Sequence, residues 1–578
     1  MCFECICFCL RKIVNSSLFF VLLALLACSG GSQDAPVSPT YTLTLVHVND
    51  THSHLEAVGL NFWIDGVRTT AQAGGFPRLK TVIDELRAND PHLLFLHGGD
   101  ALQGTLYFTL FNGEVEFDFL NLLGIDAMTF GNHEFDRGCG PIPGWIARSD
   151  FPWLSANIDF TGEPAIAPLV RPYLIKYVRG EPVAIIGLTT ETTPLTTLDV
   201  GNAVFLDAVA SARAQVARLA ARGVNKIIVL SHLGYPADLS LAASVAGIDI
   251  IVGGHSHSLL GDETNLDLIG LTPAGPYPTE LQDPEGNRVL VLQAWQWGHI
   301  LGRLNVRFSP AGEILSSEAR IILPVGDTFV QNNTPVAPES QTYQDILAAL
   351  AASGTAAIYA EDAYAAALLA PYAEQVAQYR SVKVAEALEP ILRGVNSGPG
   401  PLACDSMLPA VPNARAALIN YGGVRRDLAQ GDITVGDVLE VMPFGNTLVL
   451  VDLTGAELKA ALEEGIDFLI TAYGSDPVYL PYVALLKFSV SLSAPAGLRV
   501  SNLQIKSGAV YEPVQEATVY RIVTNAFVAN GGDGFAAIKN AAGFRSDTGG
   551  VDSDAFRNYL AALGDVSNPV EERITVIP

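Results

Sequence analysis

Short apolar runs that end in glycine or polar residues recur along the first half of the chain. They are TLTLVHVNDTH, HLLFLHGGD, IDAMTFGNHEFD, NKIIVLSHLG and IDIIVGGHSH. Amphipathic helical patterns lie between some of them, and strands that alternate with helices favour an α/β sheet with helices outside it. Ligands bind at the carboxyl ends of the strands in such sheets. A single Asp, His or Asn at such an end is an ordinary turn residue, but five such ends together predict a binding site.

The length and the charge of the chain narrow the classes of function. With 578 residues the chain is too long for one hydrophobic core, so we expect two or more domains. Its formal net charge of −26 argues against sequence-independent binding to nucleic acid, which needs a cationic surface. If the substrate is an anion, metal ions or a few well-placed arginines must supply the local positive charge.

The N-terminus has the form of an export signal. Arg11 and Lys12 precede LFFVLLALL, an apolar run of nine residues that is too short to span a bilayer. The run ends in LLAC, so residues 1–27 resemble a bacterial lipoprotein signal that is cleaved before a lipidated Cys28. The alternative interpretation is a plain signal peptide with an incidental cysteine. Residues 28–40, rich in Gly, Ser and Pro, predict a tether.

We therefore expect an exported protein, periplasmic or on the cell surface, that a lipid attaches to a membrane. Downstream of Cys28 only Cys139 and Cys404 remain, and two distant cysteines do not make a disulfide framework. Packing must then stabilise the folded body.

The sequence pattern changes after about residue 325. An Ala-rich, mostly helical stretch follows, and after it come new strand-like runs such as LVLVDL and VYRIVTNAF. We expect a first domain over residues 41–325, a helical linker or hinge over 326–382, and a second, smaller α/β domain over 383–578.

The ends of the apolar runs offer carboxylate, amide and imidazole groups, a mixture that suits borderline divalent ions such as Zn²⁺ or Mn²⁺. The candidate residues are Asp50, His52, Asp100, Asn132, His133, His232, His255 and His257. Two metal ions about 3.5–4 Å apart fit phosphoester hydrolysis, because they bridge the attacking hydroxide and neutralise phosphate oxygens. Asp100 is the candidate for a carboxylate that bridges both ions.

The ordered motifs D-x-H, GGD, GNHE-x-D, SH-x-G and GHSH resemble those of the calcineurin-like metallophosphoesterases. Together with the second domain, the chain from about Tyr41 to Pro578 resembles the bacterial 5′-nucleotidase family, which includes UDP-sugar hydrolases. The resemblance implies a four-layered metallophosphoesterase sandwich followed by a substrate-binding domain.

The resemblance also implies two divalent metal ions, Zn, Mn or similar, and a catalytic pair. One ion would be held by Asp50, His52, Asp100 and His257, and the other by Asp100, Asn132, His232 and His255. His133 would stabilise the phosphoryl transition state, and Asp136 would orient its imidazole. We interpret His54, in the same loop as His52, as a solvated residue.

Three stretches of the second domain carry candidate substrate contacts: NYGGVR, MPFGNTL and NAFVANGGDGF. Two aromatic side chains in separate loops can sandwich a base, and an arginine after two glycines can reach a phosphate. The resemblance implies base stacking by Phe444 and Phe527, base-side and phosphate contacts by Asn420 and Arg425, and a ribose contact by Asp533. The alternative is that the two aromatics are core residues and that GGDG is only a turn.

We therefore expect a 5′-nucleotidase that releases nucleoside and phosphate by attack of a metal-activated hydroxide, acting as a monomer on a nucleotide substrate. Alternatives of the same build are a UDP-sugar or NAD pyrophosphatase and a 2′,3′-cyclic phosphodiesterase, which typically has Asn where this chain has Asp136. An alternative from another class is a catalytically retired surface binding protein, which predicts broken metal ligands or lost aromatic residues.

Overall fold

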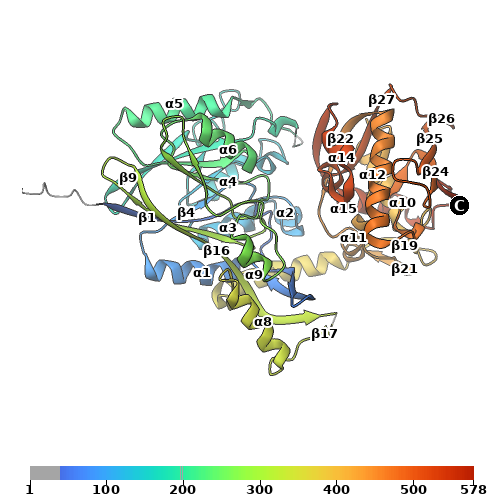
Figure 1. Ribbon diagram of the computed structural model, residues 1–578, viewed down its shortest axis with the longest axis horizontal. Helices are drawn as coiled ribbons and strands as arrows, with labels where there is room; N and C mark the ends of the chain where they lie inside the picture. Colours follow the sequence, from blue (N-terminus) through green and yellow to red (C-terminus); the bar gives the residue numbers. More distant parts are fainter. Residues whose placement is uncertain (1–39, 196, 198, 333, 578) are drawn as a thin grey trace, which may run out of the picture. The chain divides into compact units, whose positions relative to one another are not determined.

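The computed structural model describes residues 40–195, 197, 199–332 and 334–577 (Figure 1). The export signal over residues 1–27, the lipidation site at Cys28 and the tether up to residue 39 lie outside the described residues and stay predictions. Within the described part of the chain, none of the helices combines the length and the apolar character needed to cross a membrane.

The first domain is built on two sheets. The larger sheet has the order β2 (Val58–Ile64), β3 (Val67–Ala73), β16 (Ile314–Gln331), β15 (Leu301–Phe308), β1 (Tyr41–Val48), β4 (Leu94–His97), β5 (Ala127–Thr129) and β6 (Trp153–Leu154). The smaller sheet has the order β13 (Thr279–Gln282), β14 (Arg288–Leu292), β12 (Ile250–Val252), β11 (Ile227–His232), β9 (Glu181–Thr189) and β8 (Tyr173–Val178).

Parallel pairing brings the carboxyl ends of the important strands to one edge of each sheet. Strand β1 pairs in parallel with β4, and β4 with β5. In the smaller sheet β11 pairs in parallel with both β9 and β12. Strands β4, β11 and β12 are fully buried, as expected for parallel strands that are covered on both faces.

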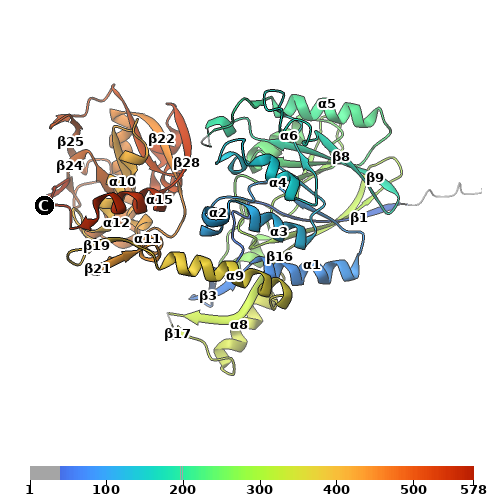
Figure 2. The same ribbon diagram turned by 180° about the vertical axis from the view of Figure 1, so that it is seen from behind.

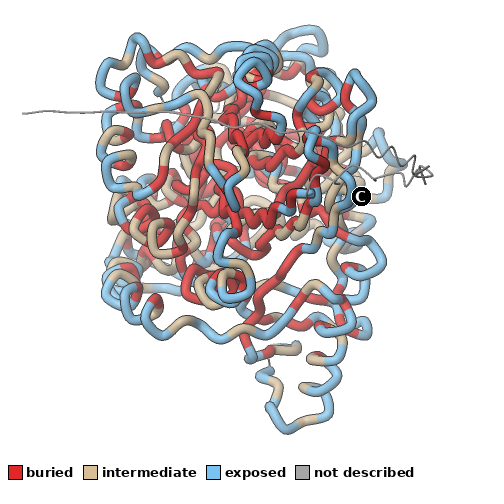
Figure 3. Tube along the Cα trace, turned by 90° about the vertical axis from the view of Figure 1, so that its left-hand side faces the viewer, coloured by how far each residue is buried: buried red, intermediate tan, exposed pale blue. Residues whose placement is uncertain are grey.

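The two sheets pack face to face, and helices cover their outer faces (Figures 1 and 2). Leu45 and Leu96 of the larger sheet share one apolar core with Leu230 and Val252 of the smaller sheet. Helices α1 (Phe76–Asn89) and α3 (Glu114–Leu123) cover the larger sheet, and α5 (Ala208–Ala220) and α6 (Tyr235–Ser244) cover the smaller one. The predicted four-layered α/β sandwich is confirmed, and in Figure 3 the buried segments lie inside and most exposed segments lie outside.

Helix α1 illustrates why these segments are helical. Its buried residues include Phe76, Leu79, Ile83 and Leu86, which recur every three or four positions and so form one apolar stripe. The shorter elements in the connections of the first domain are α2 (Leu106–Phe111), α4 (Ile142–Arg148), α7 (Glu263–Asp267), β7 (Ile158–Asp159) and β10 (Val204–Phe205).

The segment predicted as a helical linker, residues 326–382, contains strand residues as well as helices. Strand β16 continues to Gln331 and pairs there with β3, so the sheet of the first domain extends past residue 325. Strands β17 (Thr334–Pro335) and β18 (Ala356–Ile358) also pair with β16. The two helices are α8 (Gln341–Ala352) and α9 (Ala363–Arg380), and the position of a hinge within this segment stays a prediction.

The second domain is built on a five-stranded sheet with the order β23 (Tyr482–Ala484), β20 (Ala416–Ile419), β27 (Val519–Asn525), β22 (Thr447–Thr454) and β28 (Arg545–Val551). Both faces of this sheet are covered, which explains the apolar run LVLVDL. Leu448 and Leu450 of β22 face one core, and Val449 and Val451 face the other.

Each face of this sheet carries helices and a smaller sheet. The first face holds α10 (Pro399–Ala410), α11 (Val435–Val441), α15 (Asp552–Leu563) and strands β21 (Gly431–Thr434), β19 (Lys383–Ala387) and β29 (Asp565–Val566). The second holds α12 (Gly455–Tyr473), α14 (Ala536–Asn540) and strands β26 (Val510–Pro513), β25 (Val500–Ser507), β24 (Leu486–Ser491) and β30 (Ile574–Ile577). Thr454 and Glu457 form the capping box at the start of α12.

A buried carboxyl group on α3 makes the stability of the first domain depend on pH. The side chain of Glu116 is only 1% exposed, and burial raises its pKa to about 7. An unfolded chain exposes this group with an ordinary pKa, so between about pH 4.5 and pH 7 the native state binds more protons than the unfolded state. The free energy of unfolding therefore falls as the pH rises through this interval.

We predict that Glu116→Gln stabilises the protein at pH 7.5 by up to about 3 kcal/mol and leaves its stability at pH 4 nearly unchanged. The reason is that glutamine keeps the size of the side chain and removes the cost of ionising it in the core. The measurement is the midpoint of urea unfolding of wild type and variant at both pH values. A variant that is less stable than wild type at pH 7.5 would contradict the prediction.

Candidate metal centre and substrate-binding loops

Each predicted metal ligand lies at or just after the carboxyl end of a parallel strand. Strand β1 is followed by Asp50 and His52, β4 by Asp100, and β5 by Asn132; β11 ends at His232, and β12 is followed by His255 and His257. Both sheets of the sandwich therefore contribute side chains to one region. Most of these residues are buried, while His255 and His257 are partly exposed.

The backbone of the ligand loops adopts conformations that residues other than glycine rarely adopt. Asp50, His52, Asp100, His255 and His257 have positive φ angles of 49°, 45°, 55°, 72° and 48°. Such conformations cost about 1–3 kcal/mol each and persist at functional sites where the surroundings enforce them.

A glycine in one of these loops is required by close approach. A Cβ atom on Gly131 would overlap the carboxylate of Asp100. The motif GN therefore needs its glycine because the two neighbouring loops touch at this point.

The first group of ligands consists of Asp50, His52 and His257. The Nε2 atoms of His52 and His257 lie 2.9 Å apart. The Nε2 atom of His257 lies 3.4 Å from Oδ1 of Asp50, and that of His52 lies 3.9 Å from the same oxygen. Two ring nitrogens and one carboxylate oxygen thus converge on a single point.

The second group consists of Asp100, His232 and His255, whose ligand atoms all lie within 4.8 Å of one another. The Nε2 atom of His232 is 3.1 Å from Oδ2 of Asp100, and Nε2 of His52 is 3.8 Å from the same oxygen. Asp100 therefore stands between the two groups. Asn132 is buried beside them, and the adjacent His133 N–H donates to Oδ1 of Asp100 at 2.9 Å.

Hydrogen bonds to backbone carbonyls orient two of the candidate ligand histidines. Nδ1 of His52 donates to the carbonyl of Leu102 (3.1 Å), and Nδ1 of His232 donates to the carbonyl of Gly98 (2.7 Å). Because a carbonyl only accepts, Nδ1 of each ring carries a proton, which leaves the lone pair of Nε2 as the one available to a metal ion. Oxygen and imidazole donors with these lone pairs fit a divalent metal ion.

The carboxylate of Asp100 is held in its ionised form. Burial raises the pKa of Asp100, but the imidazoles of His232 and His133 outweigh burial and hold the pKa well below its usual value. A buried, ionised carboxylate beside imidazoles is suited to bind a metal ion.

His133 and Asp136 form a hydrogen-bonded pair in the turn η1 (His133–Phe135) and just after it. Nδ1 of His133 lies 2.6 Å from Oδ2 of Asp136, and the Thr197 hydroxyl donates to the other oxygen of Asp136 at 2.8 Å. Burial lowers the pKa of His133, but Asp136 and Asp100 outweigh it and raise the pKa well above its usual value. The pair is therefore built to keep a protonated imidazole in a fixed orientation.

The structure adds two features of this region that the sequence does not predict. Glu134 is not among the predicted site residues, yet its buried carboxylate accepts backbone hydrogen bonds from both neighbouring ligand loops. The expectation that His54 is a solvated loop residue is corrected, because the residue is half-buried and its ring stacks on that of Trp297 with centroids 4.6 Å apart. Neither contact is visible in the sequence, because Ala101 lies 33 positions from Glu134 and Trp297 lies far along the chain from His54.

The substrate loops of the second domain show two of the predicted residues in contact. The side-chain amide of Asn420, after β20, donates to Oδ2 of Asp533 at 2.7 Å. Asp533 lies in the short turn η5 (Gly532–Gly534) with φ 50°, and Asn525 donates to Asn420 at 3.3 Å. The GGDG motif is therefore part of a polar cluster as well as a turn.

The two predicted stacking residues are not core residues. Phe444 is 46% exposed and Phe527 is 45% exposed, which excludes the packing alternative for both. The guanidinium of Arg425 lies 5.8 Å from the centroid of the Phe444 ring. A Cβ atom on Gly532 would overlap the ring of Phe527, so the glycine-rich motif is what lets the ring pack against this turn.

Two further arginines lie beside Arg425. Arg393, Arg425 and Arg426 line an open pocket of about 480 Å³. The guanidinium of Arg393 lies 5.8 Å from the Tyr421 ring and donates to Asp427 at 3.2 Å, while Arg426 pairs with Glu440. The sequence signal for Arg393 is its position directly before the glycine-containing stretch GVNSGPG.

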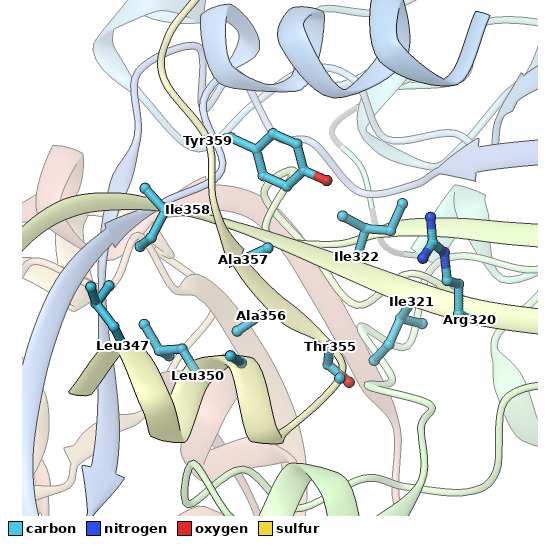
Figure 4. A pocket seen from close by; sticks show the side chains of 12 residues that line it. Arg320, Ile321, Ile322, Leu347, Leu350, Thr355, Ala356, Ala357, Ile358 and Tyr359 are labelled. Carbon is cyan, nitrogen blue, oxygen red and sulfur yellow. The ribbon is translucent and has the colours of Figure 1, made fainter. Parts of the chain in front are cut away.

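A separate pocket of about 340 Å³ lies between β16, α8 and β18 (Figure 4). It is lined by Ile322, Leu350 and Tyr359, with Arg320 at its side. None of the predicted site residues lines it, so this pocket is not part of the metal centre.

Comparisons with known proteins agree with this geometry. Residues 43–259 match the calcineurin-like phosphoesterase family, and residues 383–540 match the 5′-nucleotidase C-terminal domain. A probable 5′-nucleotidase of Treponema pallidum (strain Nichols) is 32% identical over 90% of this chain and 92% of its own length.

Two solved structures extend the likeness over nearly the whole chain. A 5′-nucleotidase precursor from Thermus thermophilus is 40% identical with a TM-score of 0.61, covering 93% of this chain and 99% of that one. The Haemophilus influenzae NAD nucleotidase is 27% identical with a TM-score of 0.77, covering 94% and 100%. The chain therefore belongs to the 5′-nucleotidase family and is a metal-dependent phosphoester hydrolase.

Proposed function

We propose that this chain is an extracytoplasmic 5′-nucleotidase that hydrolyses nucleoside 5′-monophosphates to nucleoside and phosphate. The observation that carries the proposal is the carboxylate of Asp100, which lies 3.1 Å from His232 and 3.8 Å from His52 and so stands between two groups of metal ligands. Export and attachment through Cys28 rest on the N-terminal sequence alone, and the monomeric state stays an expectation.

We propose two divalent ions at this centre. Asp50, His52, Asp100 and His257 would hold one, and Asp100, Asn132, His232 and His255 would hold the other; the donor atoms suit Zn²⁺, Mn²⁺ or similar ions. When bound, such ions neutralise phosphate oxygens and activate water. The hydrogen bonds that fix Nδ1–H of His52 and His232 orient the rings for this task.

His133 and Asp136 would stabilise the charge that develops on the phosphoryl group. Asp136 holds the Nδ1 proton of His133 at 2.6 Å, which leaves Nε2–H to donate to a phosphoryl oxygen. Asp136 raises the pKa of this imidazole and so favours its protonated form. Thr197 fixes the carboxylate of Asp136 and thereby the whole pair.

The second domain would bind the nucleoside and the negatively charged phosphate of the substrate. Phe444 and Phe527 would stack on the base, and Asn420 would contact its edge. Asp533, which Asn420 already contacts, would accept hydrogen bonds from ribose hydroxyls. Arg425 would bind phosphate, and Arg393 in the same pocket would add positive charge to a chain whose net charge is −26.

A second candidate activity is hydrolysis of NAD or a UDP-sugar at the pyrophosphate bond. The likeness to the Haemophilus influenzae NAD nucleotidase, with a TM-score of 0.77, favours keeping it. The same ligands would serve both reactions, because both are displacements at phosphorus. If the chain were a catalytically retired binding protein, metal ligands should have been lost. Instead, the candidate ligand atoms converge in both groups.

The first experiment measures phosphate release from AMP, UDP-glucose, NAD, 3′-AMP and 2′,3′-cyclic AMP. The protein is the chain after Cys28 with added Mn²⁺ or Zn²⁺, and a phosphatase step reveals products that lack free phosphate. We predict turnover of AMP that EDTA abolishes and that Asp100→Asn lowers at least about 100-fold. If metal is shown to be bound and no phosphate is released from any substrate, the proposal is contradicted.

The second experiment tests the aromatic pair. We predict that Phe444→Ala or Phe527→Ala raises KM for AMP roughly 5- to 150-fold, because base stacking contributes about 1–3 kcal/mol per base. Hydrolysis of glycerol 3-phosphate, which has no ring to stack, should be unchanged.

The matched control for this pair is Phe544→Ala. Phe544 is 45% exposed and also has an arginine over its ring, with Arg521 4.7 Å from the centroid. It lies outside the predicted substrate loops, so the KM of this variant for AMP should equal that of wild type. Equal effects of all three substitutions would contradict a stacking role.

A further inference from the structure

A buried carboxylate lies directly behind the metal ligands. Glu134 is 0% exposed. Its Oε2 accepts from the backbone N–H of Gly131 (2.6 Å) and of Asp100 (3.0 Å), and its Oε1 accepts from Ala101 (2.8 Å) and Leu102 (3.4 Å). One side chain therefore takes hydrogen bonds from the loop after β4 and from the loop after β5.

The peptide groups that bind Glu134 also hold the first ligand loop. The carbonyls of Gly99, Asp100 and Ala101 accept from the N–H groups of Asp50 (3.0 Å), His52 (3.1 Å) and Ser53 (2.9 Å). The 99–101 peptide run is thus fixed through its N–H groups on one side and through its carbonyls on the other. The loops that carry Asp50, Asp100 and Asn132 are joined through this run and Glu134.

The strained backbone of this run makes such fixation necessary. Asp100 has a φ angle of 55°, which residues other than glycine rarely adopt, whereas the φ of 88° at position 99 is open to its glycine. Hydrogen bonds to a charged group are stronger than those between neutral groups, so a carboxylate is suited to hold this conformation. Its position between the loops after β4 and β5 sets the spacing of Asp100 and Asn132.

We propose that Glu134 is a positioning residue of the metal centre: its carboxylate fixes the three ligand loops and so sets metal affinity without binding metal itself. The inference rests on the proposed function only in that the centre must bind divalent ions. Substitution of groups that orient metal ligands typically lowers metal affinity about 10- to 100-fold.

The competing explanation is that Glu134 only stabilises the fold. Glu463 in α12 supplies a matched control for it, because its side chain is 5% exposed and accepts backbone hydrogen bonds at both oxygens. Oε2 accepts from the N–H of Arg499 (2.9 Å), and Oε1 accepts from that of Val500 (2.8 Å). Glu463 belongs to the second domain and lies in no ligand loop.

The test compares the full chain as wild type, Glu134→Gln and Glu463→Gln, with Mn²⁺ alone as the probe. Glutamine keeps the size of the side chain but turns an NH₂ group toward backbone N–H donors. We expect both variants to unfold at lower urea concentration. Only Glu134→Gln should bind Mn²⁺ about 10- to 100-fold more weakly in equilibrium dialysis and lose the spin-coupled signal of two neighbouring Mn²⁺ ions.

Mn²⁺ binding by Glu134→Gln equal to wild type, at a loss of stability like that of Glu463→Gln, would overturn the inference. If Glu134→Gln does not fold, Glu134→Asp takes its place; its carboxylate is one methylene shorter, so it should also weaken Mn²⁺ binding. Wild type that binds no Mn²⁺ would overturn the inference too. Wild type that binds Mn²⁺ but does not cleave AMP would overturn the proposed substrate alone.

Discussion

The rest of the site depends on the position of the Asp100 carboxylate, where the edges of the two sheets meet. Oδ2 of Asp100 faces His232 from the smaller sheet at 3.1 Å and His52 from the larger sheet at 3.8 Å. A buried carboxylate of this kind is costly unless a cation or several donors surround it. The four-layered sandwich brings both sets of imidazoles to it, so the fold assembles the candidate metal centre.

The two domains would attract an anionic substrate in different ways. The chain carries a net charge of −26, yet it belongs to a family of phosphoester hydrolases. Attraction for an anion must therefore be local. In the proposal the metal ions supply it in the first domain, and Arg393 and Arg425 supply it in the second, while exposed Phe444 and Phe527 provide the flat surfaces that recognise a base.

The sequence predicts the residues that converge at the candidate metal centre better than the groups that support them. Asp50, Asp100 and His232 could be found because each lies at the end of an apolar run. The role of Glu134 depends on contacts with residues more than thirty positions away, which no local pattern reveals. In the same way β16 passes residue 325 because it pairs with β3, a strand from near the start of the folded body.

The most direct test of the central claim is anomalous X-ray diffraction from crystals of this protein soaked in Mn²⁺. The account predicts two anomalous peaks about 3.5–4 Å apart, with the Asp100 carboxylate in contact with both ions. The other proposed ligands should surround each peak, with His52 among them at the first and His232 at the second. A single ion, or two ions that do not share Asp100, would contradict the account.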